Sequence, residues 1–212
     1  MQPSREEIKQ SFDGRFPLAL YDRLQSSEVA IAGLGGLGSH IAVMLTRAGI
    51  GKLSLIDFDR VDISNLNRQA YDCRHLGEKK VIALAKRLRE INPYITILSY
   101  DVKVTEEAIV DLFYDQRLVC EAFDDPEAKA MLLDGIMEKC PNTVLVCGNG
   151  MAGYGDANCI QTKQYGERLY ICGDGESAIT EGMGLMAPRV ALCASHQANK
   201  IVQLILEEKD DK

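Results

Sequence analysis

A glycine-rich segment in the first quarter of the chain has the residues that phosphate binding requires. Its glycines, Gly33, Gly35, Gly36 and Gly38, follow an apolar run and precede a segment with helical apolar spacing. Glycines let backbone amides approach a phosphate at the positive end of a helix. Asp57 lies 19 residues after Gly38, where an acid can bind ribose hydroxyls. These residues predict a nucleotide site; a tight turn without ligand is the structural alternative.

The polar stretch after Asp57 favours ATP over NAD. It carries Asp59, Asn65 and Arg68, and Lys80 follows shortly afterwards. A triphosphate that loses pyrophosphate needs cations near the leaving oxygens, whereas a nicotinamide enzyme has no use for them. The alternative interpretation is a solvated loop, with Arg68 in a surface salt bridge and Lys80 on a helix surface.

Two adjacent carboxylates follow an apolar run at residues 118–121. Asp124 and Asp125 would lie at the carboxyl end of a strand, where open α/β sheets bind their ligands. The carboxylate of Asp124 can hold Mg²⁺ against phosphate oxygens. Asp125, directly before Pro126, is equally well explained as a helix N-cap. The sequence therefore predicts Asp124 as the metal ligand.

The spacing of apolar residues predicts the elements that position these side chains. Strands are expected at residues 29–32, 53–57, 95–98, 118–121 and 143–147, and helices at 36–48, 79–91, 106–114 (capped by Thr105) and 126–140. A hairpin is expected at 158–163 and 168–172, before a glycine-rich loop and a helix that opens at Pro188. Such alternation requires crossover connections. The predicted fold class is α/β: a Rossmann-like, doubly wound, mostly parallel sheet with an antiparallel edge hairpin and a C-terminal helix.

Composition predicts one domain over residues 1–212. Its parts would be an N-terminal helical arm (1–27), a nucleotide-binding core (28–157), and a segment with the edge hairpin, crossover loop and C-terminal helix (158–212). With 46% hydrophobic residues the chain can bury a full core, which excludes intrinsic disorder. The 24 basic against 31 acidic residues argue against a nucleic-acid or anionic-membrane partner.

Location and redox state also follow from the residues. No run approaches the roughly 20 apolar residues of a membrane span, and the charged first ten residues are unlike a signal peptide, so a cytoplasmic protein is expected. Seven cysteines without a C-x-x-C pair indicate reduced thiols, with no disulfide framework and no zinc site.

Several motifs together resemble the ThiF, MoeB and HesA adenylyltransferases, bacterial relatives of the ubiquitin-activating enzymes. They lie at residues 33–39, 57–69, 77–80, 91–93 and 186–188. The resemblance implies that Asp57 binds the ATP ribose, that Asn65, Arg68 and Lys80 bind the phosphates, and that Asp124 acts through Mg²⁺ on the transition state. Similarity at 151–155, 170–175 and 195–199 is to a short-form ThiF of thiamine biosynthesis.

The resemblance also implies a substrate and an assembly. The substrate would be the C-terminal Gly-Gly carboxylate of a small ubiquitin-like, ThiS-like sulfur carrier, which attacks the α-phosphate and expels pyrophosphate. Such a carboxylate is already ionised and needs no general base, so His40, His75 and His196 are expected to be structural. Members of the family dimerise, and Arg15 is the candidate for an arginine that reaches the partner's γ-phosphate. A helix after Pro188 would expose four small residues for that contact: Ala191, Ala194, Ser195 and Ala198.

Departures from the family pattern limit what can be carried over. The zinc-binding cysteine pairs are incomplete, since Leu169 stands where the first pair needs a cysteine. Thr180 or Glu181 occupies the region of the cysteine that forms a sulfur-linked intermediate in some relatives. Cys172 is the nearest thiol, and we expect it to face inward and to form no adduct. The loop at 173–184 is expected to act as a lid.

Three other functions stay open at this point. The same fold could activate another acceptor, either a molybdopterin carrier or a carboxylate on a modified tRNA base. A non-catalytic module that binds ubiquitin-like proteins would be expected to lack Arg68, Lys80 or Asp124, and all three are present. An NAD-dependent oxidoreductase is disfavoured by the same residues.

Overall fold

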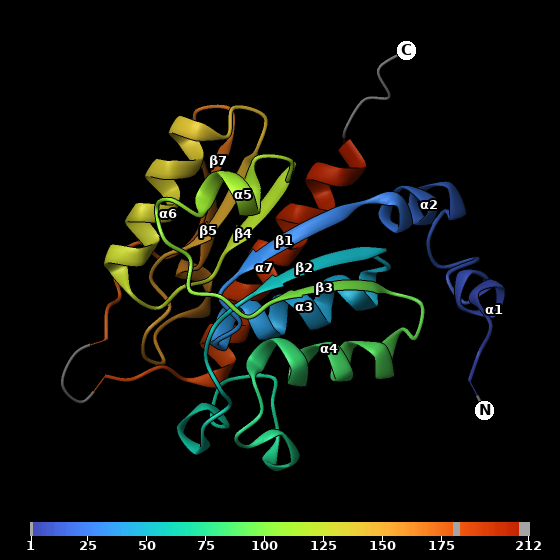
Figure 1. Ribbon diagram of the computed structural model, residues 1–212, viewed down its shortest axis with the longest axis horizontal. Helices are drawn as coiled ribbons and strands as arrows, with labels where there is room; N and C mark the ends of the chain where they lie inside the picture. Colours follow the sequence, from blue (N-terminus) through green and yellow to red (C-terminus); the bar gives the residue numbers. More distant parts are fainter. Residues whose placement is uncertain (1, 180–182, 208–212) are drawn as a thin grey trace.

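Seven strands form one sheet in the computed structural model, which describes residues 2–179 and 183–207. Figure 1 shows its arrangement. The strands are β1 (Glu28–Ala32), β2 (Lys52–Ile56), β3 (Thr96–Tyr100), β4 (Leu118–Glu121), β5 (Val144–Gly148), β6 (Gln161–Tyr165) and β7 (Leu169–Gly173). Their order is β3-β2-β1-β4-β5-β7-β6, and every pair is parallel except β6 with β7. The predicted fold class is confirmed.

The order of the strands fixes where a ligand can bind. From β1 the chain builds outward through β2 to β3, and then returns to place β4 on the other side of β1. Diverging crossovers leave a crevice beyond the carboxyl ends of β1 and β4, which is where doubly wound sheets bind their ligands. The glycine-rich turn after β1 and the Asp124 turn after β4 both open at this switch point.

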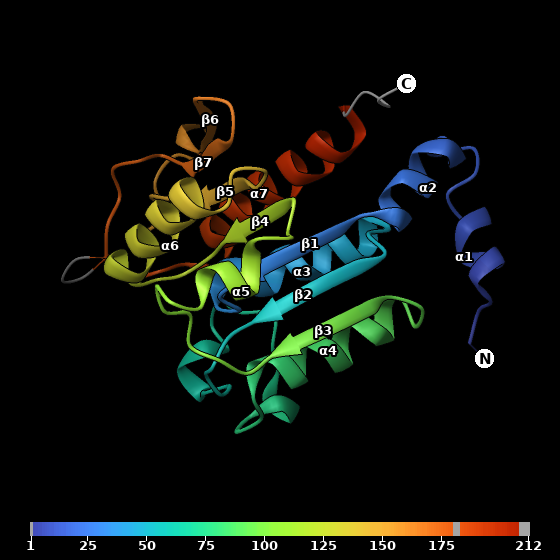
Figure 2. The same cartoon turned by 45° about the horizontal axis from the view of Figure 1, so that its top comes forward.

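Helices cover both faces of the sheet, as Figures 1 and 2 show. On one face lie α3 (Gly36–Ala48), α4 (Lys80–Ile91) and α7 (Ala187–Glu207), and on the other lie α5 (Ile109–Phe113) and α6 (Pro126–Lys139). Successive strand residues point to opposite faces, so Val29 and Ile31 pack into the first layer and Ala30 and Ala32 into the second. Burial on both faces explains why these strands are continuously apolar rather than alternating.

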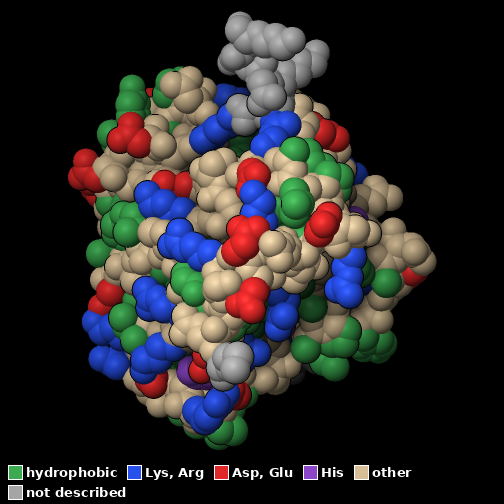
Figure 3. All heavy atoms as spheres, turned by 90° about the vertical axis from the view of Figure 1, so that its right-hand side faces the viewer, with side chains coloured by type: hydrophobic (Ala, Val, Ile, Leu, Met, Phe, Trp, Pro, Cys, Tyr) green, Lys and Arg blue, Asp and Glu red, His purple; other side chains and the backbone are tan. Residues whose placement is uncertain are grey.

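Two short helices, α1 (Arg5–Gln10) and α2 (Leu18–Ser26), form the N-terminal arm. The arm lies at the amino ends of the strands, at the right of Figure 1. Figure 3 views this face and shows basic and acidic side chains mixed across it. None of the helices in residues 2–179 and 183–207 combines the length and the apolar character that a bilayer crossing needs.

Three details of the sequence prediction were wrong. Helix α5, expected at residues 106–114, begins at Ile109, because residues 106–108 form a separate turn in which the Ala108 amide donates to the Thr105 carbonyl oxygen. The first hairpin strand begins at Gln161, after a 3-10 turn at Ala157–Cys159. The small residues of α7 are not an exposed stripe, since Ala194 and Ala198 are buried in the core layer shared with α3.

Candidate nucleotide site

The glycine-rich turn forms a cradle that side chains would fill. Gly33 has φ +91°, and a Cβ there would lie 2.8 Å from the Ala122 carbonyl oxygen. A Cβ at Gly38 would overlap the backbone oxygen of Gly33. Helix α3 begins at Gly36, and its N-cap, Gly35, has no side chain to satisfy the first amides. Since the first four amides of a helix have no partner within it, this end is open to an anion.

Asp57 ties the end of β2 to this turn. Its Oδ2 accepts from the Leu34 amide and its Oδ1 from the Asp59 amide, each at 2.7 Å. Burial raises the pKa of the Asp57 carboxyl, and the nearby Lys80 ammonium and the two amides oppose that rise. Asp57 therefore lies beside the glycine-rich turn, held by backbone donors, with further oxygen lone pairs that a hydroxyl can use.

Lys80 presents a buried cation at the same edge of the sheet. Its Nζ lies 2.7 Å from Asp59 Oδ2 and 3.9 Å from Asp57 Oδ2, and its side chain is only 7% exposed. It is the first residue of α4 and is not the exposed helix lysine of the alternative interpretation. The half-exposed Asp59 neutralises Lys80 in this structure.

The residues of the polar loop lie against the glycine-rich turn. Arg68 Nη1 donates to the Ser64 carbonyl oxygen and to Asn67 Oδ1, both at 3.0 Å. The Arg68 Nε and the Gln69 Oε1 are buried and have no hydrogen-bond partner among the described residues. Unpaired buried polar atoms are costly, and these two, beside an open phosphate cradle, are groups that a polar ligand can satisfy. This is the observation by which the site fits a nucleotide.

Asn65 has a local role in the same loop. Its Oδ1 accepts from the Asp62 amide at 3.0 Å, while the Asp62 side chain accepts from the Ser64 amide. These bonds cap the 3-10 helix Ile63–Asn65. Asn65 therefore shapes the loop that carries Arg68, and any contact of its own with a phosphate stays a prediction.

The two carboxylates after β4 have different surroundings. Asp125 caps α6, with its oxygens accepting from the Glu127 and Ala128 amides at 3.3 Å. Asp124 is exposed and has no partner in the part of the chain that the structure describes. The Phe123 ring lies 2.9 Å from where a Gly33 Cβ would be, so this turn abuts the glycine cradle.

A metal ion at Asp124 would depend on a bound nucleotide. Within residues 2–179 and 183–207, no group of three or more histidine, cysteine or carboxylate side chains could hold a metal. Mg²⁺ commonly uses one or two carboxylates together with substrate phosphates, and the lone Asp124 fits that pattern. A separate zinc site was not expected from the sequence.

The sequence did not predict a role for two residues at this edge, Glu121 and Lys129. Glu121 ends β4 with its side chain fully buried, and Lys129 Nζ lies 2.7 Å from its Oε2. The available signal was a glutamate that ends an otherwise apolar strand, since a buried carboxylate needs a partner. The partner could not be identified from spacing alone.

The histidines and Cys172 lie in structural positions. His40 Nε2 lies 3.1 Å from the Arg68 carbonyl oxygen, and burial lowers the pKa of this imidazole. His75 belongs to a 3-10 cap, and His196 Nδ1 lies 3.0 Å from Thr162 Oγ1. Cys172 is fully buried, as expected, and burial raises the pKa of its thiol. A buried thiol with a raised pKa is a poor nucleophile.

The predicted lid is anchored in its first part. Arg189 Nη2 lies 2.5 Å from Asp174 Oδ2, and Asp174 Oδ1 accepts from the Glu176 and Ser177 amides. Burial acts to raise the pKa of Asp174, but these bonds hold it at about 2. Thr180 and Glu181, for which a role in the crossover was considered, lie outside the described residues.

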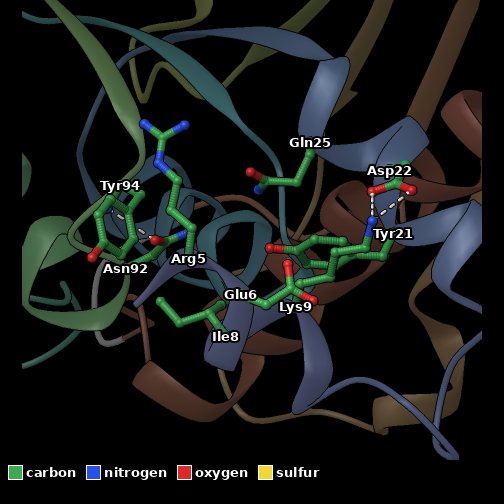
Figure 4. A pocket seen from close by; sticks show the side chains of 9 residues that line it. All are labelled: Arg5, Glu6, Ile8, Lys9, Tyr21, Asp22, Gln25, Asn92 and Tyr94. Carbon is green, nitrogen blue, oxygen red and sulfur yellow. Dashed lines mark hydrogen bonds and ion pairs between the residues drawn. The ribbon is translucent and has the colours of Figure 1, made fainter. Parts of the chain in front are cut away.

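Arg15 lies between α1 and α2, in the arm that Figure 1 shows at the opposite end of the sheet from the site. Its arm packs through Phe12, whose ring centroid is 4.6 Å from that of Tyr21 in α2. A cavity of about 190 Å³ opens between the arm and the body, and Figure 4 shows Arg5 beside Tyr94 and Lys9 paired with Asp22 there. This cavity is lined by the nine residues labelled in Figure 4 and shares none of them with the glycine-rich edge.

Comparison with known proteins gives a consistent family. The model of the ThiF family matches residues 10–212. Molybdopterin-synthase adenylyltransferase of Salmonella typhimurium is 32% identical over 208 residues, which cover 95% of this chain and 80% of that protein. The protein of the same name from Escherichia coli K12 is 33% identical, over 92% of this chain and 76% of its own length.

Solved structures support the fold. The tRNA N6-threonylcarbamoyladenosine dehydratase of E. coli, in complex with ATP, superposes with a TM-score of 0.82 over 97% of each chain. Its sequence is 21% identical, so this likeness concerns the architecture.

Proposed function

Since the chain belongs to the ThiF family and is an adenylyltransferase, we propose that it adenylates the C-terminal Gly-Gly carboxylate of a ubiquitin-like sulfur carrier. The observation that carries this proposal is the edge where an open glycine cradle meets Arg68, Asp124 and the buried Lys80. Neither Arg68 Nε nor the Asp124 carboxylate has a partner among the described residues. A cradle with cations beyond it suits a nucleoside triphosphate that loses pyrophosphate.

In the proposed reaction, a carboxylate oxygen of the carrier attacks the α-phosphorus of ATP. A bond forms between that oxygen and the α-phosphorus. The bond from the α-phosphorus to the oxygen that bridges to the β-phosphorus breaks, and pyrophosphate leaves with its electron pair. Arg68 and Lys80 offset the charge that develops on the leaving group. The attacking carboxylate has an unperturbed pKa near 3.5, so no protein base is required, in keeping with the structural positions of the histidines.

The remaining residues bind and orient the nucleotide in this proposal. The amides at Gly33, Gly35, Gly36 and Gly38 approach the phosphates, Asp57 accepts from the ribose, and Asn65 and Asp125 shape the loops on either side. Asp59 releases Lys80 to the phosphates when ATP binds. Mg²⁺, held by Asp124 and the phosphates, would neutralise charge on the transferring group.

For the carrier we propose a ThiS-like protein of thiamine biosynthesis, on the motifs at residues 151–155, 170–175 and 195–199. A second candidate is a carrier of molybdopterin synthesis, which is favoured by relatives named molybdopterin-synthase adenylyltransferase that share 32% and 33% identity. A modified tRNA base is a third acceptor, suggested by the dehydratase fold and opposed by the net charge of −7.

We further propose a homodimer in which Arg15 acts on the partner's nucleotide. In its own chain the arm lies at the amino ends of the strands, so Arg15 could reach a nucleotide only in another copy. The division into an arm (1–27), a core (28–157) and a C-terminal segment (158–212) of one domain, and a cytoplasmic location, belong to this proposal.

Pyrophosphate exchange into ATP tests the proposal. Labelled pyrophosphate should enter ATP only when Mg²⁺ and a suitable carrier are present, and a carrier without its Gly-Gly terminus should give none. The two carriers and a threonylcarbamoyl-modified tRNA are compared side by side, and the active one identifies the acceptor class. Absence of exchange with every acceptor, or tighter binding of NAD than of Mg-ATP in calorimetry, would contradict it.

A further inference from the structure

An ion pair between the fully buried Glu121 and the partly buried Lys129, whose side chain is 23% exposed, lies directly beneath the turn that carries Asp124. Lys129 Nζ donates to both carboxylate oxygens of Glu121, at 2.8 and 2.7 Å, and to the carbonyl oxygen of Gly148 at 2.8 Å. Glu121 Oε1 also accepts from the Phe123 amide at 2.7 Å. The two charges therefore join the turn after β4, the N-terminal part of α6 and the last residue of β5.

The same strand ends are held from the other face of the sheet. Gln197 of α7 donates from Nε2 to the carbonyl oxygen of Glu121 at 2.9 Å and to that of Val146 at 3.2 Å. Its side chain is fully buried, and a Cβ at Gly148 would lie 2.9 Å from its Oε1. Polar side chains thus bind the carboxyl ends of β4 and β5 from both faces of the sheet, Lys129 from α6 and Gln197 from α7.

Stability alone does not explain this arrangement. Burying the Glu121 carboxylate, and most of Lys129 with it, costs desolvation energy that their attraction often fails to recover, and apolar pairs of similar volume are commonly as stable. The pair lies at the switch point of the sheet, and the Ala122 carbonyl oxygen that follows Glu121 abuts the Gly33 turn. Its location points to a role at the nucleotide site.

We propose that Glu121 and Lys129 are positioning residues for adenylyl transfer. Their ion pair fixes the Phe123 turn and the end of β5 relative to the glycine cradle, and so determines where Asp124 stands against the nucleotide. The inference rests on the proposed function. Glu121 and Lys129 act through the loops that they hold and do not contact the substrate. A misplacement of about 1 Å in a reactive geometry can lower a rate about 100-fold, which sets the size of the expected effect.

The test compares Lys129→Met with Lys129→Arg and with Lys139→Met. Lys139 is in the last turn of the same helix and pairs with Glu106 at the surface, so it is the matched control. In carrier-dependent pyrophosphate exchange, Lys129→Met should lower kcat about 100-fold with KM for ATP changed less than about threefold. Lys129→Arg should restore most of kcat, and Lys139→Met should match the unsubstituted protein.

Hydrogen exchange in the nucleotide-free protein gives a second readout that does not depend on activity. Amides at residues 122–124 and 148–150 should exchange faster in Lys129→Met than in Lys139→Met. If Lys129→Met does not fold, the double variant Glu121→Gln/Lys129→Met replaces it, because it leaves no buried charge unpaired. The proposal would be overturned if folded Lys129→Met had an unchanged kcat, or if its KM for ATP rose by as much as its kcat fell. It would also be overturned if Lys129→Arg did not restore kcat. Lack of pyrophosphate exchange in the unsubstituted protein would contradict the proposed function instead. The hydrogen-exchange comparison would still show whether the Glu121–Lys129 pair orders residues 122–124 and 148–150.

Discussion

Asp124 and Asp125 are neighbours in sequence, but only Asp125 contributes to the structure of a helix. The second caps a helix, whereas the first is exposed and has no partner in the described chain. Replacing Asp124 by asparagine should therefore leave the free energy of unfolding within about 0.5 kcal/mol, while carrier-dependent exchange falls by about 100-fold or more. Asp134→Asn, at an exposed acid of the same helix, is the control for both measurements. A variant that retains full exchange would move the metal role to another side chain.

Lys80 differs from its neighbour Lys79 in burial and in partners. Lys79 pairs with Asp101 at the surface, whereas Lys80 is buried against Asp57 and Asp59. Lys80→Met should weaken Mg-ATP binding in calorimetry and lower the free energy of unfolding by about 1–3 kcal/mol, because Asp57 loses its cation. Lys79→Met should change neither quantity beyond about 0.5 kcal/mol. Equal effects of the two substitutions would show that burial of Lys80 has no functional consequence.

The same variant has an expected pH dependence. Burial raises the pKa of Asp57, and Lys80 opposes that rise. When the folded state binds a proton more tightly than the unfolded chain, stability falls as pH rises between the two pKa values. In Lys80→Met the folded pKa rises further, so Tm should fall more steeply than in the unsubstituted protein as pH rises from about 4 to 8. Parallel Tm curves for the two proteins would disprove the coupling between Asp57 and Lys80.

At the residue scale, the sequence predicted the groups that belong to a continuous motif. Gly33, Asp57 and Lys80 converge because they end or begin elements whose order was predictable. The pair of Asp59 with Lys80 was not predictable, because it depends on how a loop folds back. Glu121 with Lys129 was missed since it joins a strand end to the next helix, and no periodicity encodes that contact.

At the scale of elements, apolar spacing predicted the buried strands and long helices because each has an extended apolar face. It failed for α5, which has only five helical residues, Ile109–Phe113. It also misjudged α7, where Ala194 and Ala198 permit close approach of α3 within the same chain rather than of a partner. A stripe of small residues specifies a close contact without specifying what makes it.

The turn between β1 and α3 tests whether its glycines are required by geometry. In Gly38→Ala the new Cβ would overlap the Gly33 carbonyl oxygen, a backbone atom that cannot move without displacing the cradle. We expect a loss of about 1–3 kcal/mol in urea unfolding, together with loss of measurable Mg-ATP binding in calorimetry. Gly184→Ala is the control, since a Cβ there meets no atom of residues 2–179 and 183–207 within 4 Å. Unchanged unfolding and binding in Gly38→Ala would show that the turn is not closely packed.

At the scale of the whole molecule, the arm and the site lie at opposite ends of one sheet, so a role for Arg15 in catalysis requires two copies. Arg15→Ala and Asp124→Asn should each abolish exchange alone. In an equal mixture, half of the dimers contain one of each variant, and in these one site has both residues intact. Activity should then recover to about a quarter of that of the unsubstituted protein, as expected for a symmetric dimer whose subunits exchange.

The control is a mixture of Lys80→Met with Asp124→Asn, which should restore no activity. Both residues act in the site of their own chain, so each site of a mixed dimer lacks one of them. Recovery absent from the first mixture, with subunit exchange verified by sedimentation of tagged chains, would rule out action of Arg15 across the dimer.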